Sequence, residues 1–243
     1  EADYARGNCR ILRNRLTNCF IGLSSQPGLG GPTYFIRNVM YNITYMPFKL
    51  YRFSQGDVCL HNTVVKVGDG MSSKDDRPFD HAYFRNNLFI GGAGKAKWGN
   101  QGYNNASGQG IARAACLSMF GPHCDFDYDA LGVVESKFAG KLGTFTFSNL
   151  EELKRGPYEK HAVQVDMSVF DNVVFPSQGG TVFKAPDLRP KAGSVVVDAG
   201  CRLANINDGY LGAAPDMGAY EAGQELPAYG PRPDGVDEET AAR

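Results

Sequence analysis

The segment around Lys49 carries side chains that could do acid–base chemistry on a charged sugar. In Phe48-Lys49-Leu50-Tyr51-Arg52 apolar and polar residues alternate, and alternate side chains of a β-strand point to opposite faces. Phe48 and Leu50 are therefore predicted to be buried, with Lys49 and Tyr51 exposed beside Arg52. A lysine base, a tyrosine proton donor and an arginine that neutralises a carboxylate are the three groups that β-elimination of a uronate requires. The same side chains also suit an ordinary solvated strand.

Four asparagines, 24 residues apart, define the elements that must position these groups. They are Asn14, Asn38, Asn62 and Asn86, and apolar residues recur two positions before and two positions after each. This alternation predicts half-buried strands bent at the asparagine, and the fixed period predicts a solenoid. In a parallel β-helix, equivalent residues stack about 4.8 Å apart, so the amides can bond one another as a ladder. Asparagine also tolerates the left-handed backbone that such turns often need.

The same frame stacks other polar residues one coil apart. Glu1, Ser25 and Lys49 share one column, and Asp3 lies in the column of Tyr51, so one outer face is predicted to present these groups within about 10 Å. A lysine base there would need its pKa lowered by burial or by neighbouring cations. Glu1 and Asp3 are oxygen ligands that could hold calcium. As two nearby carboxylates they are also the pair that a glycoside hydrolase would need.

A second column lies directly before the asparagines and consists of Arg13, Arg37, His61 and Arg85. Like charges stacked one rung apart repel each other, so these side chains either splay into water or have an anion along them. An acidic polysaccharide is a suitable anion, which makes Arg13 and Arg37 candidates for substrate binding. In the elimination scheme His61 is the alternative base, and Arg37 is the alternative neutralising cation.

Composition divides the chain into four parts. Regular coils are predicted over residues 1–95, an irregular glycine-rich loop over 96–123, further coils and a cap over 124–222, and a flexible tail over 223–243. Trp98, in the loop, could stack on a sugar ring. Residues 147–156 predict a short helix with Ser148 as its N-cap. Cys116 and Cys124 flank a short Gly-Pro loop and could close a disulfide.

Charge and hydropathy limit the classes of partner. The formal net charge of −1 provides no global field that would recruit nucleic acid or a membrane surface. No apolar stretch approaches the roughly 20 residues of a membrane-spanning helix. The chain opens inside a repeat, and solenoids need capped ends, so another chain or a missing segment is expected to cover the first coil.

Two sets of motifs resemble right-handed parallel β-helix proteins of the pectate-lyase-like superfamily. The first set comprises Asn8-Cys-Arg-Ile-Leu-Arg-Asn-Arg-Leu-Thr-Asn, Gly31-Pro-Thr-Tyr-Phe-Ile-Arg-Asn-Val-Met-Tyr-Asn and His61-Asn-Thr. The second set, Val197-Asp-Ala-Gly with Asn207-Asp-Gly-Tyr-Leu-Gly-Ala-Ala-Pro-Asp-Met-Gly-Ala-Tyr-Glu, is similar to the C-terminal ending of secreted bacterial members. The resemblance covers most of residues 8–222. It implies an all-β, right-handed parallel β-helix with an irregular C-terminal region containing the short helix, in a secreted or cell-surface protein.

This superfamily includes lyases, hydrolases, epimerases and members without a known reaction, so fold resemblance does not select an activity. The expected function is to bind or cleave an acidic polysaccharide. Elimination is favoured over hydrolysis because lysine, arginine and tyrosine outnumber paired acids on the proposed face. Calcium, which commonly helps superfamily members bind uronates, is the one cofactor considered. The alternative is a noncatalytic extracellular structural or adhesive module within a larger assembly.

Overall fold

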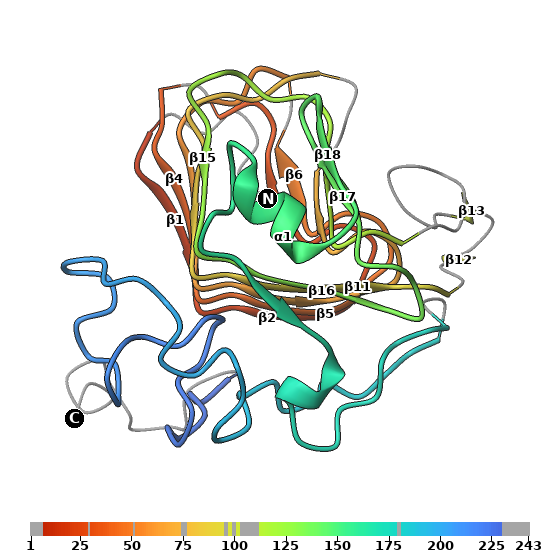
Figure 1. Ribbon diagram of the computed structural model, residues 1–243, viewed down its shortest axis with the longest axis vertical. Helices are drawn as coiled ribbons and strands as arrows, with labels where there is room; N and C mark the ends of the chain where they lie inside the picture. The colour runs from red at the N-terminus through yellow and green to blue at the C-terminus, as the bar shows by residue number, and fades with distance from the viewer. Residues whose placement is uncertain are drawn as a thin grey trace.

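Short strands from successive segments of the chain stack as parallel sheets in the computed structural model (Figure 1). The structure describes residues 7–28, 30–50, 52–73, 77–94, 97–98, 101–102, 112–178 and 181–229. From β1 to β10, every third strand joins the same sheet. The chain is therefore all-β with parallel stacked strands, as predicted, and this arrangement is compatible with a β-helix.

Three faces surround the interior. The first sheet contains, in spatial order, β1 (Cys9–Leu12), β4 (Thr33–Ile36), β7 (Asp57–Leu60), β10 (Tyr83–Arg85) and β15 (Asp125–Phe126). The second sheet contains β2 (Arg15–Cys19), β5 (Val39–Ile43), β8 (Thr63–Val65), β11 (Leu88–Gly92), β16 (Ala130–Val134) and β19 (Val163–Val165). The third face consists of two groups, β3 (Leu23–Ser25) with β6 (Phe48–Leu50), and β9 (Met71–Ser72) with β14 (Ala115–Leu117), β17 (Gly140–Leu142) and β18 (Phe145–Phe147).

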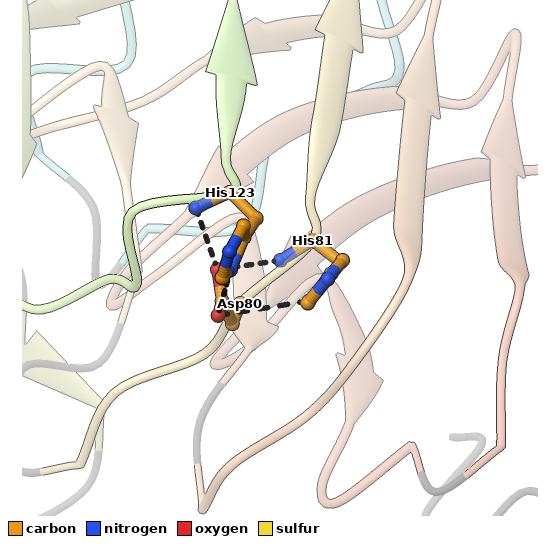
Figure 2. Close-up of side chains that lie close together, drawn as sticks. All are labelled: Asp80, His81 and His123. Atoms are coloured by element: carbon orange, nitrogen blue, oxygen red, sulfur yellow. Dashed lines mark hydrogen bonds and ion pairs between the residues drawn. The ribbon is translucent and has the colours of Figure 1, made fainter.

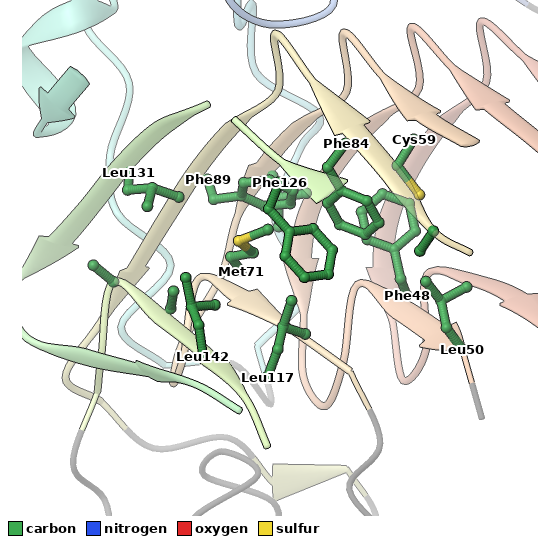
Figure 3. Packing of buried hydrophobic residues seen from close by; sticks show 14 of the residues in the cluster. Phe48, Leu50, Cys59, Met71, Phe84, Phe89, Leu117, Phe126, Leu131 and Leu142 are labelled. Carbon is green, nitrogen blue, oxygen red and sulfur yellow. The ribbon is translucent and has the colours of Figure 1, made fainter. Parts of the chain in front are cut away.

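Phenylalanine, leucine and methionine side chains from all three faces fill the interior of the stack (Figure 3). Phe84 and Phe126 meet edge to face with ring centroids 5.1 Å apart. The predicted alternation in β6 is confirmed, because Phe48 and Leu50 are 1 % and 0 % exposed. Helix α1 (Leu150–Arg155) follows the last strand of the third face, and its Leu153 is buried in this same cluster.

The second sheet is buried on both faces. Its outward side chains, such as Tyr41 and Ile90, pack against Phe170, Leu188 and Met217 of the C-terminal segment, which follows the 3-10 helix η1 (Met167–Val169) and runs beside this sheet (Figure 1). Burial on both faces explains why β5 and β11 are buried at every position and why, apart from Asn42, they contain only apolar residues and glycine. The outer face of the first sheet, by contrast, is partly exposed.

The asparagine ladder exists, but its fourth amide is Asn87 and not Asn86. Successive amides donate Nδ2 to Oδ1 from Asn14 to Asn38 and from Asn38 to Asn62, each at 3.0 Å, and from Asn62 to Asn87 at 2.9 Å. The predicted Asn86 is wrong because β7 and β10 pair with an offset of 25 residues, Cys59 opposite Phe84. The earlier pairs have an offset of 24.

The left-handed backbone lies one residue before each ladder position. Positive φ angles of 51–58° occur at Arg13, Arg37, His61 and Asn86. The second column therefore continues with Asn86, and the predicted Arg85 is wrong at this place. Arg85 instead forms an ion pair of 2.7 Å with Asp125.

The structure also corrects three local predictions. The segment 96–123 contains a two-stranded hairpin, β12 (Lys97–Trp98) and β13 (Gln101–Gly102), and strand β14, which pairs with β9 and β17. The N-cap of α1 is Asn149 rather than Ser148, since the Asn149 side chain accepts from the N–H of Glu152. Cys116 and Cys124 are free thiols and do not form the predicted disulfide. Cys116 lies in β14 of the third face, whereas Cys124 lies directly before β15 of the first sheet.

Candidate functional site

His61, proposed as a base, is buried and occupies a structural position. Its side chain is 0 % exposed. Nδ1 lies 3.2 Å from the carbonyl oxygen of Gly218, which can only accept, so Nδ1 carries the proton. Nε2 then accepts from the side-chain amides of Asn86 at 3.0 Å and Asn207 at 2.9 Å. With both nitrogens engaged and no access to solvent, His61 joins the coils to the C-terminal segment.

Burial, followed by the nearby Arg37 guanidinium, lowers the pKa of His61 from 6.5 to about 3. The unfolded chain thus takes up a proton between these two pH values that the folded chain does not, and stability must fall as the pH drops through this window.

His61→Gln is expected to be less stable than the wild type at pH 7 by about 2–3 kcal/mol, because buried hydrogen bonds are lost. Below pH 6.5 this difference should narrow by about 1.4 kcal/mol per pH unit, since only the wild type has the titrating ring. Denaturant unfolding of both proteins at several pH values measures the difference. A gap that stays constant down to pH 4 contradicts a buried neutral His61.

The other proposed catalytic residues lie on the third face or beyond the described residues. Lys49 is half-buried in β6 and pairs with Ser24 across the neighbouring strand. Arg52 is exposed just after that strand, while Tyr51 lies outside the described residues. Ser25, proposed to contact substrate, is 0 % exposed, and its Oγ lies 2.8 Å from the Ser54 hydroxyl. It pairs with Leu50 and not with Lys49, so it points into the interior.

Arg13 and Arg37 come together in a groove on the outer face of the first sheet. A cavity of about 510 Å³ lies between strands β1 and β4 and the C-terminal segment. Its lining combines three arginines with apolar, aromatic and amide side chains, namely Arg10, Leu12, Arg13, Tyr34, Ile36, Arg37, Asn205 and Ile206. Cavities of this volume, with an apolar floor and a few polar groups, are typical of small-ligand sites.

The arginines of this groove have different roles. Arg37 is largely buried, and it donates to the carbonyl oxygen of Ala219 at 3.2 Å and to the Glu221 carboxylate at 3.4 Å. Burial lowers the pKa of Arg37 and raises that of Glu221, so this pair is desolvated and holds the C-terminal segment in place. Arg13 is exposed, and within the part of the chain that the structure describes its guanidinium has no hydrogen-bond or ion-pair partner.

Arg10 and Tyr34 extend the groove along the sheet. Arg10 is exposed, and its guanidinium carbon lies 5.9 Å from the centre of the Tyr34 ring. Strand pairing sets the two side by side, because Arg10 stands opposite Tyr34 in the parallel register of β1 and β4. The groove thus offers guanidinium groups for an anion next to an aromatic face, a combination that suits a sugar ring carrying a carboxylate.

A second cavity of about 210 Å³ continues from the same two arginines beneath the C-terminal segment. Tyr220 and Tyr229 line it with their hydroxyl oxygens 2.5 Å apart, and the Arg15 guanidinium lies 4.5 Å from the Tyr229 ring centre. The first residues of the predicted flexible tail therefore pack on the body of the protein, and residues 230–243 lie outside the described residues. Burial raises the pKa of Tyr220, so its phenol stays protonated and cannot serve as a base.

The remaining predicted site residues are untested. Glu1 and Asp3, the proposed calcium ligands, lie outside the described residues. Trp98 belongs to the β12–β13 hairpin, but its side chain is not described. The contributions of Arg10 and Tyr34 were missed, although their outward positions follow from the alternation of β1 and β4. Asn205 and Ile206 form the other wall of the groove, and they belong to no sequence repeat from which their position could have been predicted.

Comparisons of the chain with protein-family models, with curated proteins and with solved structures find no match. Among the described residues, no helix is long and apolar enough to cross a membrane.

Proposed function

We propose that this chain is a secreted or cell-surface protein that binds an acidic polysaccharide in the groove along β1 and β4. We further propose that its stacked sheets form a right-handed parallel β-helix of the pectate-lyase-like type. The observation that carries the function is the 510 Å³ groove, which is lined by the exposed cations Arg10 and Arg13 and by the Tyr34 ring beside Arg10. Arg13 and Arg37 stand one coil apart, and a bound anion would relieve the repulsion between them.

Binding is favoured over cleavage by the groove's composition. The described residues that line it include no aspartate, glutamate, histidine or lysine. Lys49 is on the third face and His61 is buried, so neither of the two bases predicted for the elimination scheme is accessible beside the arginines. The position of these two bases favours a protein that does not cleave its ligand. The cationic groove favours an acidic saccharide as that ligand.

Arg13→Gln is expected to weaken binding to pectate or alginate by about 10- to 150-fold, because one charge-assisted contact is worth about 1.5–3 kcal/mol. Arg155→Gln is the matched control, since Arg155 is equally exposed but lies on α1. Affinity should also fall with ionic strength, because exposed charges are screened. Calorimetric titration of both variants with pectate, alginate, ulvan and a glycosaminoglycan measures the effect.

Equal affinities of the two variants for every polymer contradict the groove as the binding site. Failure of the wild type to bind any of the four favours the structural or adhesive alternative. Release of an unsaturated, ultraviolet-absorbing product during the titration would show instead that the protein is a lyase.

A further inference from the structure

Two aspartates fasten adjacent coils through the same local geometry. In both Asp80 and Asp127, Oδ1 accepts two backbone hydrogen bonds. One comes from the N–H of the next residue, and the other comes from the N–H of a histidine in the following coil. For Asp80 these donors are His81 at 2.8 Å and His123 at 3.1 Å. For Asp127 they are Tyr128 at 2.9 Å and His161 at 2.7 Å. In both cases Oδ2 faces Nδ1 of that histidine, at 2.9 and 2.8 Å.

An aromatic ring completes each motif. The residue after the aspartate has a positive φ, 54° at His81 and 59° at Tyr128, and its ring stacks on the histidine of the next coil. The ring centroids are 4.5 Å apart for His81 with His123, and 4.2 Å apart for Tyr128 with His161. A tyrosine therefore suffices for the structural role, and that role does not account for a histidine at position 81.

His81 places a third ligand atom beside Asp80 and His123 (Figure 2). Its Nδ1 lies 3.6 Å from Asp80 Oδ2 and 3.0 Å from Gln55 Oε1. One ligand atom from each of Asp80, His81 and His123 lies within 4.8 Å of the other two. Tyr128 offers no equivalent nitrogen.

We propose that Asp80, His81 and His123 bind a late first-row divalent cation such as zinc. Two imidazoles and one carboxylate are a donor set that suits such ions, with a fourth position for water or Gln55. The carboxylate is 19 % exposed and is held by two backbone N–H groups, whereas the rings of His81 and His123 are 57 % and 61 % exposed. The ion reaches the site from solvent without any opening of the fold.

Zinc binding requires the two rings to move. They now stack with an angle of 19° between their planes, so their in-plane lone pairs lie in two nearly parallel planes and cannot both point at one ion. Zinc takes nitrogen at about 2.0–2.1 Å, so each ring must tilt. Nδ1 of His123 must give up its hydrogen bond to the Asp80 carboxylate, and Nδ1 of His81 its hydrogen bond to Gln55. Both rings are exposed enough to do this, and Asp80 stays fixed by its backbone donors.

Isothermal titration of the full chain with zinc chloride tests the site, with His81→Tyr as the decisive variant. That substitution reproduces the ring arrangement of Tyr128 and His161, so the fold is expected to persist, and circular dichroism checks this. The wild type should bind one zinc ion per chain, and His81→Tyr should bind it at least tenfold more weakly. His161→Gln, in the matching motif, should bind like the wild type.

Three results would overturn the proposal: no zinc binding by the wild type at millimolar concentration, unchanged affinity in folded His81→Tyr, or a loss in His161→Gln as large as that in His81→Tyr. The site lies just before strands β10 and β15, away from the groove along β1 and β4. Its test is therefore independent of polysaccharide binding.

Discussion

Asn62→Ala is expected to lower the free energy of unfolding by about 3–5 kcal/mol, because a buried group with several hydrogen bonds is removed. The Asn62 side chain is 0 % exposed. Its Oδ1 accepts from both the backbone N–H and the amide of Asn38 at 3.0 Å. Its Nδ2 donates to the carbonyl oxygen of Phe35 at 2.8 Å and to Asn87 at 2.9 Å. Alanine leaves the Asn38 N–H without this acceptor inside the protein.

Asn14→Ala is the matched control for this experiment. Asn14 has the same place in the first coil, but its side chain is exposed and, among the residues that the structure describes, donates only to Asn38 and to the Leu12 carbonyl. Water can replace those contacts, so the expected loss is below about 1 kcal/mol. Denaturant unfolding of both variants measures the two losses. Similar losses would show that ladder position does not determine the contribution of an asparagine.

Asp129→Asn is expected to stabilise the protein at high pH. Asp129 ends the ladder, where its Oδ1 accepts from the backbone N–H and the amide of Asn87 at 2.7 and 2.9 Å. Both Asp129 and the neighbouring Glu159 are 0 % exposed. Burial raises the pKa of Asp129 from 3.8 to about 7, and burial together with the Asp129 charge raises the pKa of Glu159. An asparagine keeps the acceptor and removes one of the two facing acids.

The sign of the pH dependence follows from these shifts. Between pH 3.8 and about 7 the unfolded chain has released the Asp129 proton and the folded chain has kept it, so wild-type stability falls as the pH rises. Asparagine does not titrate. The variant should match the wild type near pH 4 and exceed it near pH 8 by on the order of 3 kcal/mol.

Unfolding of the wild type and Asp129→Asn across this range measures the difference. Asp125→Asn is the control, because Asp125 is 59 % exposed and pairs with Arg85 at the surface, where an ion pair contributes about 0–1 kcal/mol. A variant less stable than the wild type near pH 8 would mean that Asp129 is needed as a carboxylate.

Much of the architecture was readable from the sequence. The recurrence of asparagine with apolar neighbours predicted stacked parallel strands, because equivalent positions in successive coils see the same environment. The pairing of Leu12 with Ile36 and of Ile36 with Leu60 follows this period. The column that includes Arg13 and Arg37 was also predictable, since it precedes the ladder in each coil, but the burial of Arg37 and His61 within it was not.

The tertiary structure alone decided between Asn86 and Asn87. Both residues are asparagines, and a shift of one residue exchanges the two faces of a strand. The frame that puts Phe84 in the interior, next to Phe126, places Asn87 in the ladder. Asn86 then turns outward, and its side chain bonds both backbone groups of Cys201.

By itself, the sequence determined the parallel stacking of the strands and the first three asparagines of the ladder, because these depend on contacts repeated at a fixed separation along the chain. The partners of His61 and the far wall of the groove came only from the tertiary structure. Both depend on residues 200–220 packing against coils more than a hundred residues earlier. Such contacts occur once and have no period, so no pattern in the sequence records them.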